Sequence, residues 1–355
     1  MTKQIPALDG FRAIAISIVI ASHAGLGALV PGGFGVTIFF FLSGFLITTL
    51  LRVEHATTGR VDLKAFYLRR SLRIFPPFYI TIALVALAAM LGAFNGSVNL
   101  RYIGWDLLFL SNYSWQIDAS SMIPIPLWSL NVEEHFYIAF SALFAFVLAR
   151  IDPRKAAKIC LALCAATLLV RIANVALLPD YSNNYYWSHT RIDSILFGSC
   201  LAFFQNPVLE EKAWRPKMGH VALAALVLLA CLGIRNDVFR ETLRYTLQGG
   251  ALFVVFSAAI QAEGVVARLM NNGLTRIIAL LSYTLYLAHV PLIRMFEEAR
   301  LPAPELLGIA AAVAYSAVMY RLVEKPCGNL RRRLEKDRPR NRHPDAPLRE
   351  ASSAP

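Results

Sequence analysis

Long apolar runs dominate this sequence and restrict what the chain can fold into more than any other feature. They approach or exceed the ~20 residues that a helix needs to cross a bilayer, and 57% of the 355 residues are hydrophobic. Because a segment in lipid must satisfy its own backbone hydrogen bonds, the pattern predicts an all-α, polytopic membrane bundle. We identify ten candidate transmembrane helices, at 7–29, 34–53, 74–94, 127–149, 156–178, 189–206, 217–235, 242–262, 275–296 and 304–323.

The basic residues predict how these helices are oriented. The net charge is +12, and its distribution is uneven: with the N-terminus in the cytoplasm, 26 of the 35 Lys and Arg lie in cytoplasmic segments and five in outer loops. This asymmetry follows the positive-inside rule and predicts that both termini are cytoplasmic. Topology and contact with anionic lipid account for the charge, so we expect no nucleic acid partner.

The sequence divides into one membrane domain, residues 1–328, and a basic tail, residues 329–355. The tail is charged, rich in proline and poor in apolar residues, so we expect it to be disordered. Before the third transmembrane range, residues 54–73 have the pattern of a short amphipathic helix on the membrane surface. We expect Pro76 and Pro77 to break that helix.

The longest predicted outer loop, residues 95–126, is rich in aromatic residues, among them Trp105, Tyr113 and Trp115. Aromatic side chains form belts at membrane interfaces, and their flat faces also suit a sugar ring. Both interpretations stay open.

Arg12 and His23 lie within the first predicted helix, in the stretch LDGFRAIAISIVIASH. On a helix their separation is about three turns, or ~16 Å along nearly the same face. Asp9, one turn before Arg12, is placed to pair with it. Taken singly, Arg12 could be an arginine that snorkels to the membrane interface, and His23 could be a hydrogen-bonded packing histidine. Two ionisable residues on one face of a membrane helix usually line a cavity or a bundle interior, so we expect a functional site here.

The stretch PLWSLNVEEHFY brings three adjacent ionisable residues, Glu133, Glu134 and His135, into the fourth predicted helix. Trp128 opens this helix, and Tyr137 lies one turn after Glu133. Three neighbouring groups cannot all be charged in lipid, so at least one should face a cavity. The alternative is an interfacial cluster that faces water.

The third candidate is the arginine cluster of YLRRSLRIF, which contains Arg69, Arg70 and Arg73 on the cytoplasmic side. Guanidinium groups at helical spacing suit phosphate, although positive-inside charge alone would also explain them. Weaker candidates for substrate binding are further ionisable residues in the predicted helices: Arg191, Asp193, His289 and Glu324.

Several kinds of site are not indicated. The sequence contains no P-loop, HExxH or GxSxG motif, which disfavours an ATPase and a covalent serine hydrolase. The five cysteines form no CxxC pair, so we expect neither a disulfide framework nor a zinc site.

Seven blocks, taken in order, resemble the acyltransferase-3 family of bacterial membrane O-acyltransferases. They extend over about residues 5–328, and the short basic tail resembles the family's stand-alone form. The blocks are LDGFRAIAISIVIASH, GGFGVTIFFFLSGFLIT, FYLRRSLRIFPPFY, PLWSLNVEEHFY, RIDSILFGSCLA, SYTLYLAHVPL and VEKP.

The resemblance implies an enzyme of the bacterial inner membrane that uses no metal. It would move an acyl group, usually acetyl, from cytoplasmic acyl-coenzyme A to a sugar hydroxyl of exopolysaccharide, lipopolysaccharide or another surface glycoconjugate. The family's first-helix pair corresponds to Arg12 and His23, and its RxxR pair, expected near the coenzyme A phosphates, to Arg70 and Arg73. Trp128 and Glu133 match its WSLxxE block.

Together these observations predict three groups of site residues. We expect His23, as general base or transient acyl acceptor, to act with Arg12 and Glu133 in catalysis. The arginine cluster of Arg69, Arg70 and Arg73 should bind the donor. Residues expected to bind the acceptor are Trp128, His135, Tyr137, Arg191, Asp193, His289 and Glu324.

Two other functions fit much of the same pattern. A transporter or flippase for a glycolipid or polysaccharide precursor would also have ten helices, intramembrane charge and a cavity. A membrane scaffold for polysaccharide assembly is the third option. The sequence leaves open the acyl group, the acceptor, which could be lipid-linked or polymeric, and any polysaccharide-assembly partners.

Overall fold

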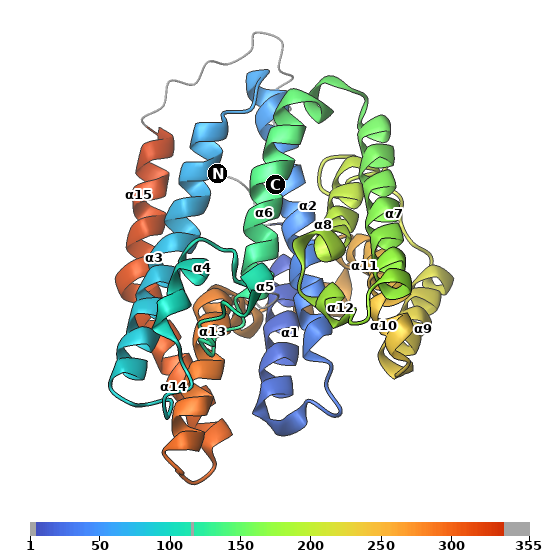
Figure 1. Ribbon diagram of the computed structural model, residues 1–355. Helices are drawn as coiled ribbons and strands as arrows, with labels where there is room; N and C mark the ends of the chain where they lie inside the picture. Colours follow the sequence, from blue (N-terminus) through green and yellow to red (C-terminus); the bar gives the residue numbers. More distant parts are fainter. Residues whose placement is uncertain (1–4, 115–116, 337–355) are drawn as a thin grey trace.

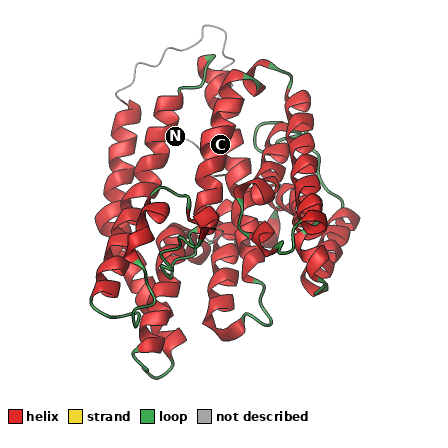
Figure 2. Ribbon diagram, viewed as in Figure 1, coloured by secondary structure: helices red, strands yellow, loops and turns green. Residues whose placement is uncertain are grey.

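The computed structural model describes residues 5–114 and 117–336, and every regular element among them is a helix (Figures 1 and 2). The predicted all-α membrane bundle is therefore confirmed. Helix α15 extends to Lys336, so the first residues of the predicted tail are helical. Trp115 and residues 337–355 lie outside the described residues.

Within the described ranges, each of the ten predicted transmembrane ranges falls on a long helix. Eight apolar segments are long enough to cross a membrane, whereas α8 and α9, with 16 residues each, fall short of that length. Ten crossings therefore stay a prediction. The long helices are α1 (Leu8–Ala21), α2 (Gly32–Thr58), α3 (Leu63–Met90), α6 (Trp128–Phe146), α7 (Pro153–Leu177), α8 (Ser188–Phe203), α9 (Met218–Gly233), α11 (Leu243–Ile260), α13 (Gly273–Glu298) and α14 (Pro304–Met319).

Short elements connect and extend these helices. Two are π-helical turns: η1 (Ser22–Leu26) continues α1, and η6 (Tyr320–Glu324) joins α14 to α15 (Lys325–Lys336). The others are η2 (Leu100–Tyr102), α4 (Ile103–Leu107), α5 (Ser111–Ser114), η4 (Leu148–Arg150), η5 (Ser182–Tyr185), α10 (Asp237–Glu241) and α12 (Gly264–Met270).

The bundle has two distinct ends (Figure 1). We call the upper one the basic end: it carries the α2–α3 connection, the α6–α7 connection and α15, where the sequence predicts the cytoplasm. We call the lower one the opposite end: it carries the α1–α2 connection, the α9–α10 corner and the α13–α14 connection.

The prediction of a separate surface helix over 54–73, broken at the prolines, is wrong. Helix α2 runs to Thr58, and α3 then continues from Leu63 to Met90 through Pro76 and Pro77. Membrane helices tolerate proline where their neighbours satisfy the freed backbone groups. The carbonyl groups that lose their N–H partner are those of Leu72 and Arg73. Pro77 and Phe78 are buried against neighbouring helices, and beside the prolines the Tyr283 hydroxyl of α13 donates to the Ile74 carbonyl oxygen at 2.9 Å.

Helices α2 and α8 approach each other closely at the centre of the bundle. A Cβ added at Gly44 would lie 1.8 Å from the Ile195 carbonyl oxygen, and one at Gly198 would lie 2.0 Å from the Phe41 carbonyl oxygen. Only residues without a side chain permit this separation between the two backbones. Helix α2 is thereby held against α8 on one side, and its other sides contact α1 and α6.

Candidate active site

A cavity lies in the middle of the bundle between α1, α2, α3, α6 and α13. It encloses about 90 Å³, and we call it the central cavity. Five of the residues predicted to form the site line it, from three helices far apart in the sequence: Arg12, Arg70, Arg73, Glu133 and Tyr137. The structure thus gathers most of the predicted catalytic and donor-binding groups around one space.

The charges of the central cavity are only partly compensated. Arg12 lies 3.5 Å from the carboxylate of Asp9. Neither Arg70 nor Arg73 has a carboxylate oxygen within 4 Å in the described part of the chain. Arg70 instead stands over the ring of Tyr137, 5.2 Å from its centroid. Two guanidinium groups are therefore available for an anion.

The carboxyl side of the cavity is more ordered. The Tyr137 hydroxyl donates to Glu133 Oε2 at 2.6 Å and lies 3.2 Å from Ser43 Oγ. Glu134, which the sequence brought into the cluster without a predicted role, also lines the cavity. The next residue of the cluster does not, because the His135 ring contacts the Ser188 hydroxyl at 2.6 Å.

A second cavity of about 370 Å³ opens at the basic end, and we call it the vestibule. Arg12 and Arg73 line both it and the central cavity, so the two spaces meet at these side chains. The vestibule also contains Glu324, which accepts a hydrogen bond from Thr284 Oγ1 at 2.5 Å. Its remaining basic residues come from α13 and α15: Arg276, Lys325, Arg331 and Arg332.

Those four basic residues were not predicted as site residues. Their only sequence signal was cytoplasmic basic charge, in the connection before the ninth predicted helix for Arg276 and in the C-terminal segment for the other three, which the positive-inside rule explains equally well. Arg69, by contrast, was predicted to bind the donor but lies outside both cavities. Its guanidinium donates to Glu54 Oε2 at 2.6 Å, so the structure gives it a partner elsewhere.

His23 meets a second predicted residue, His289, from the other end of the sequence. His23 Nδ1 lies 2.9 Å from the Val19 carbonyl oxygen and 3.4 Å from His289 Nε2. His289 Nδ1 lies 3.0 Å from the Leu285 carbonyl oxygen. Carbonyl oxygens only accept hydrogen bonds, so both Nδ1 atoms carry a proton.

This arrangement leaves His23 Nε2 as a lone pair with no partner among the described residues. His289 is fully buried, whereas His23 is exposed at the opposite end. The π-helical turn η1 presents the His23 ring, and such turns occur frequently at functional sites. Between the pair and the central cavity stands Tyr286, whose ring centroid is 5.8 Å from that of His289.

Arg191 is buried without a carboxylate partner in the described part of the chain. Its Nη2 donates to Thr37 Oγ1 at 3.2 Å, but Nε and Nη1 have no hydrogen-bond partner there. The guanidinium lies 3.7 Å from the centroid of the Tyr245 ring. Three further rings surround it at 5.3 to 5.7 Å: Phe40, Trp128 and Tyr185.

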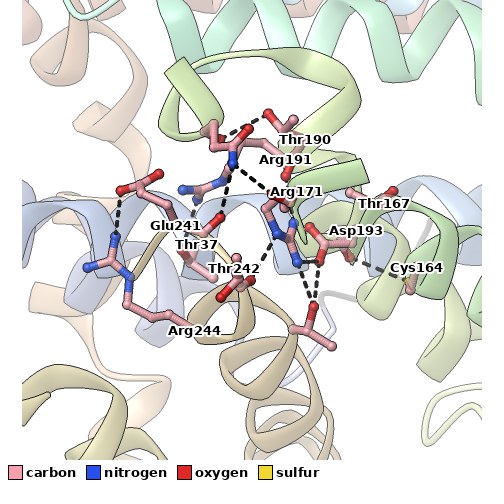
Figure 3. A network of polar contacts seen from close by, with 12 residues as sticks. Thr37, Cys164, Thr167, Arg171, Thr190, Arg191, Asp193, Glu241, Thr242 and Arg244 are labelled. Atoms are coloured by element: carbon pink, nitrogen blue, oxygen red, sulfur yellow. Dashed lines mark hydrogen bonds and ion pairs between the residues drawn. The ribbon is translucent and has the colours of Figure 1, made fainter. Parts of the chain in front are cut away.

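Asp193, two residues further along α8, lies in a different environment (Figure 3). It forms an ion pair of 2.7 Å with Arg171, and both side chains are 0% exposed. Arg171 also donates to Thr246 Oγ1 and to the carbonyl oxygens of Thr190 and Thr242. This network ties α7, α8 and α11 together, and substrate binding by Asp193 stays a prediction.

Over most of its length the chain is similar to known acyltransferases. The chain matches the family model described as an acyltransferase domain over residues 5–320. A protein of Staphylococcus aureus (strain COL), named an O-acetyltransferase by inference, is 29% identical over 352 residues, 91% of this chain and 57% of the relative. O-acetyltransferase OatA of Staphylococcus aureus (strain NCTC 8325 / PS 47) is 27% identical over 345 residues, with the same 91% and 57% coverage.

The chain thus spans a little over half the length of the curated relatives it matches. No solved structure matches it significantly. The family match includes both cavities' shared residues, Arg12 and Arg73, as well as the histidine pair. The resemblance found in the sequence is therefore confirmed, and the chain belongs to the acyltransferase family.

Proposed function

We propose that the protein transfers an acyl group, acetyl in the first instance, from cytoplasmic acyl-coenzyme A to a sugar hydroxyl of a cell-surface glycoconjugate. The site of the reaction would be the bacterial inner membrane. The observation that carries the proposal is that Arg70 and Arg73, in a cavity that meets a basic vestibule, have no carboxylate within 4 Å among the described residues. The names of the two relatives support O-acetyl transfer.

The donor would bind from the basic end. Coenzyme A carries several phosphate charges, and the vestibule supplies Arg276, Lys325, Arg331 and Arg332 to meet them. Its thioester arm would then pass Arg12 and Arg73, which line both spaces, into the central cavity. No metal is required in this scheme.

Glu133 would position the donor rather than exchange protons with it. Its carboxylate holds the Tyr137 hydroxyl at 2.6 Å, and the Arg70 guanidinium rests on the Tyr137 ring. Removing the carboxylate would free both neighbours at once. The role of Glu133 is therefore to keep Arg70 oriented toward the arm of the donor.

The acceptor would approach from the opposite end, where His23 is exposed. His23 Nε2 takes the proton of the attacking hydroxyl as its oxygen bonds to the thioester carbonyl carbon. The carbon–sulfur bond breaks, and the proton passes to the departing thiolate, which leaves as coenzyme A. The Nε2 lone pair of His289 faces the Nδ1–H of His23 and would hold that ring with Nε2 free for the hydroxyl.

The test is mass spectrometry of surface glycans from cells with the gene, without it, and with His23→Ala. We expect the acyl mass to be lost without the gene. With His23→Ala it should fall by roughly 10²–10⁴-fold in initial rate at normal protein abundance, the usual range for an acid–base group. His55→Ala is the control, because His55 lies near the basic end and lines neither the central cavity nor the vestibule.

Two results would contradict this proposal. If the His23→Ala protein is abundant and acylates at the normal rate, His23 is not the general base. Glycans that stay inside the cell but carry their acyl groups when the gene is absent would identify a transporter or flippase instead.

A further inference from the structure

A third cavity, of about 480 Å³, lies at the opposite end of the bundle, and the proposed reaction does not use it. We call it the outer pocket. It is bounded by the segment 27–34, by η5, by the end of α9, by α10 and by the start of α11. All of these segments belong to the end away from the vestibule (Figure 1).

The outer pocket is basic. It contains Arg235, Arg240 and Arg244, which are three of the five basic residues predicted for outer loops. Arg240 lies 3.4 Å from Asp237, and Arg244 lies 4.0 Å from Glu241. Arg235 is exposed and donates to the Ala28 carbonyl oxygen at 3.1 Å, with no carboxylate within 4 Å in the described ranges.

Glu241 and Arg244 face each other at the wall of the pocket (Figure 3), but each keeps one polar atom without a hydrogen-bond partner among the described residues. Arg244 Nε and Glu241 Oε2 are buried, and neither has a hydrogen-bond partner in the described chain. Burial raises the pKa of the Glu241 carboxyl, against the opposing effect of Arg244. Behind the Tyr245 ring, Arg191 adds a buried cation with two more unpartnered nitrogens.

Aromatic rings supply the rest of the wall. Tyr185, Tyr186 and Tyr245 all line the pocket, and Gln248 adds an amide. Flat aromatic faces beside fixed donors and acceptors are what a sugar ring requires. A phospholipid headgroup would use the arginines but would leave the tyrosine faces and the Glu241 acceptor without a ligand group.

We propose that the outer pocket binds a carboxylate-bearing sugar unit of the glycan acceptor. Arg235 and Arg244 would hold the carboxylate, the Tyr185 and Tyr186 rings would stack on the sugar, and Glu241 Oε2 would accept from a hydroxyl. The buried Tyr245 would hold Arg244 in place, because its hydroxyl accepts from Arg244 Nη2 at 2.7 Å. This proposal rests on the proposed acyl transfer in one respect only, namely that the bound glycan is its acceptor.

The position of the pocket fits a unit next to the one that reacts. The segment 27–34 follows η1 directly, so one short connection separates the pocket from His23. A Cβ at Gly32 would lie 2.8 Å from the Ser22 side chain, and one at Gly33 would lie 2.6 Å from the Tyr185 hydroxyl. At these two glycines the backbone of the connection therefore passes close to the His23 turn on one side and to the pocket wall on the other. A polymeric acceptor could therefore reach both.

The test is binding of oligoglucuronate, compared with a neutral glucose oligomer of equal length, to the full-length protein in nanodiscs of zwitterionic lipid. We expect saturable binding of the charged oligomer, at least about tenfold tighter than the neutral one, because charge-assisted hydrogen bonds carry the difference. Arg235→Gln, at an exposed position, and Arg244→Gln should each remove most of that preference. Arg154→Gln, at the basic end, is the matched control.

Equal binding of the two oligomers, or unchanged binding by both variants, would overturn the proposal. Displacement of the charged oligomer when phosphatidylglycerol is added to the nanodiscs would identify a lipid-headgroup site and would also overturn it. Acetyl-coenzyme A binding is measured on the same samples. Oligomer binding without donor binding would support the outer pocket as a glycan site and contradict the proposed acyl transfer. Donor binding without a preference for the charged oligomer would support acyl transfer and contradict the glycan site.

Discussion

At the scale of single residues, two buried arginines show how differently the same group can be used. Arg171 is neutralised by Asp193, and each of its three nitrogens donates a hydrogen bond, so it joins helices. Arg191, by contrast, has rings on several sides, and two of its nitrogens have no hydrogen-bond partner among the described residues. Burying a cation without a partner is costly, so an arginine in this state usually has a function.

The arginines of the central cavity give the sharpest prediction at this scale. The double variant Arg70→Gln and Arg73→Gln should bind acetyl-coenzyme A in detergent more weakly by about 1.5–3 kcal/mol for each lost charged hydrogen bond. Arg69→Gln should bind the donor normally, because its guanidinium is held by Glu54 outside the cavity. Isothermal titration on the three purified proteins measures the difference.

The same experiment separates donor binding from topology. If the double variant binds the donor as tightly as the unmodified protein, Arg70 and Arg73 serve only as positive-inside charge. An equal loss in Arg69→Gln would mean that the whole cluster acts through general electrostatics instead of through the cavity.

At the scale of helices, departures from regular geometry mark the places where the bundle is specialised. Both π-helical turns carry a predicted site residue: η1 presents His23 and η6 ends at Glu324. Within η1, Gly25 has a φ of 85°, a left-handed conformation that favours glycine. The regular helical geometry of α1 therefore ends within η1.

The contact between α2 and α8 gives a prediction at this scale. Gly198→Ala should reduce folded protein in the membrane, because its Cβ would lie 2.0 Å from the Phe41 carbonyl oxygen. Forcing such helices apart costs about 1–3 kcal/mol or more. The measurement is the midpoint of thermal unfolding in detergent, followed by fluorescence-detected size exclusion.

Gly250→Ala is the matched control. Gly250 also lies inside a helix, α11, but an added Cβ would meet nothing within 4 Å. Alanine is the better helix former, so this variant should unfold at the same temperature or slightly higher. Equal melting of the two variants would show that α2 and α8 can separate at little cost.

At the scale of the whole molecule, the charge distribution and the cavities both distinguish the two ends of the bundle. The vestibule lies at the basic end and the exposed His23 at the opposite end, so the two proposed substrates would reach the bundle from different sides. The central cavity lies between them, with Tyr286 standing before the histidine pair. Such an arrangement suits a reaction that takes an acyl group through the membrane.

This orientation can be measured directly. Fluorescent-protein and phosphatase fusions after Gly59 and after Arg333 should both report cytoplasm, and fusions after Asn95 should report the outer side. The expectation rests on the 26 to five division of basic residues and on an even number of crossings. An outer-side signal after Arg333 would require an odd number, and the two 16-residue helices would be the first to reconsider.

The sequence by itself determined the helices and their expected orientation. Hydropathy and charge are local properties, so a run of apolar residues predicts a membrane helix wherever its neighbours lie. The motif blocks were equally readable, and they led to Arg12, Arg70, Arg73 and Glu133, which do share one cavity. Even so, local pattern misled at Pro76 and Pro77, where contacts from α13 and burial let α3 continue.

Only the tertiary structure decided which residues meet. His23 and His289 are 266 positions apart, and nothing in either local sequence names the other as its partner. The same reason applies to two other findings. The sequence did not predict the basic residues that α13 and α15 bring to the vestibule, and it did not predict the ion pair between Arg171 and Asp193. Contacts between distant helices depend on how their side chains and small residues pack, and that packing is a property of the whole bundle.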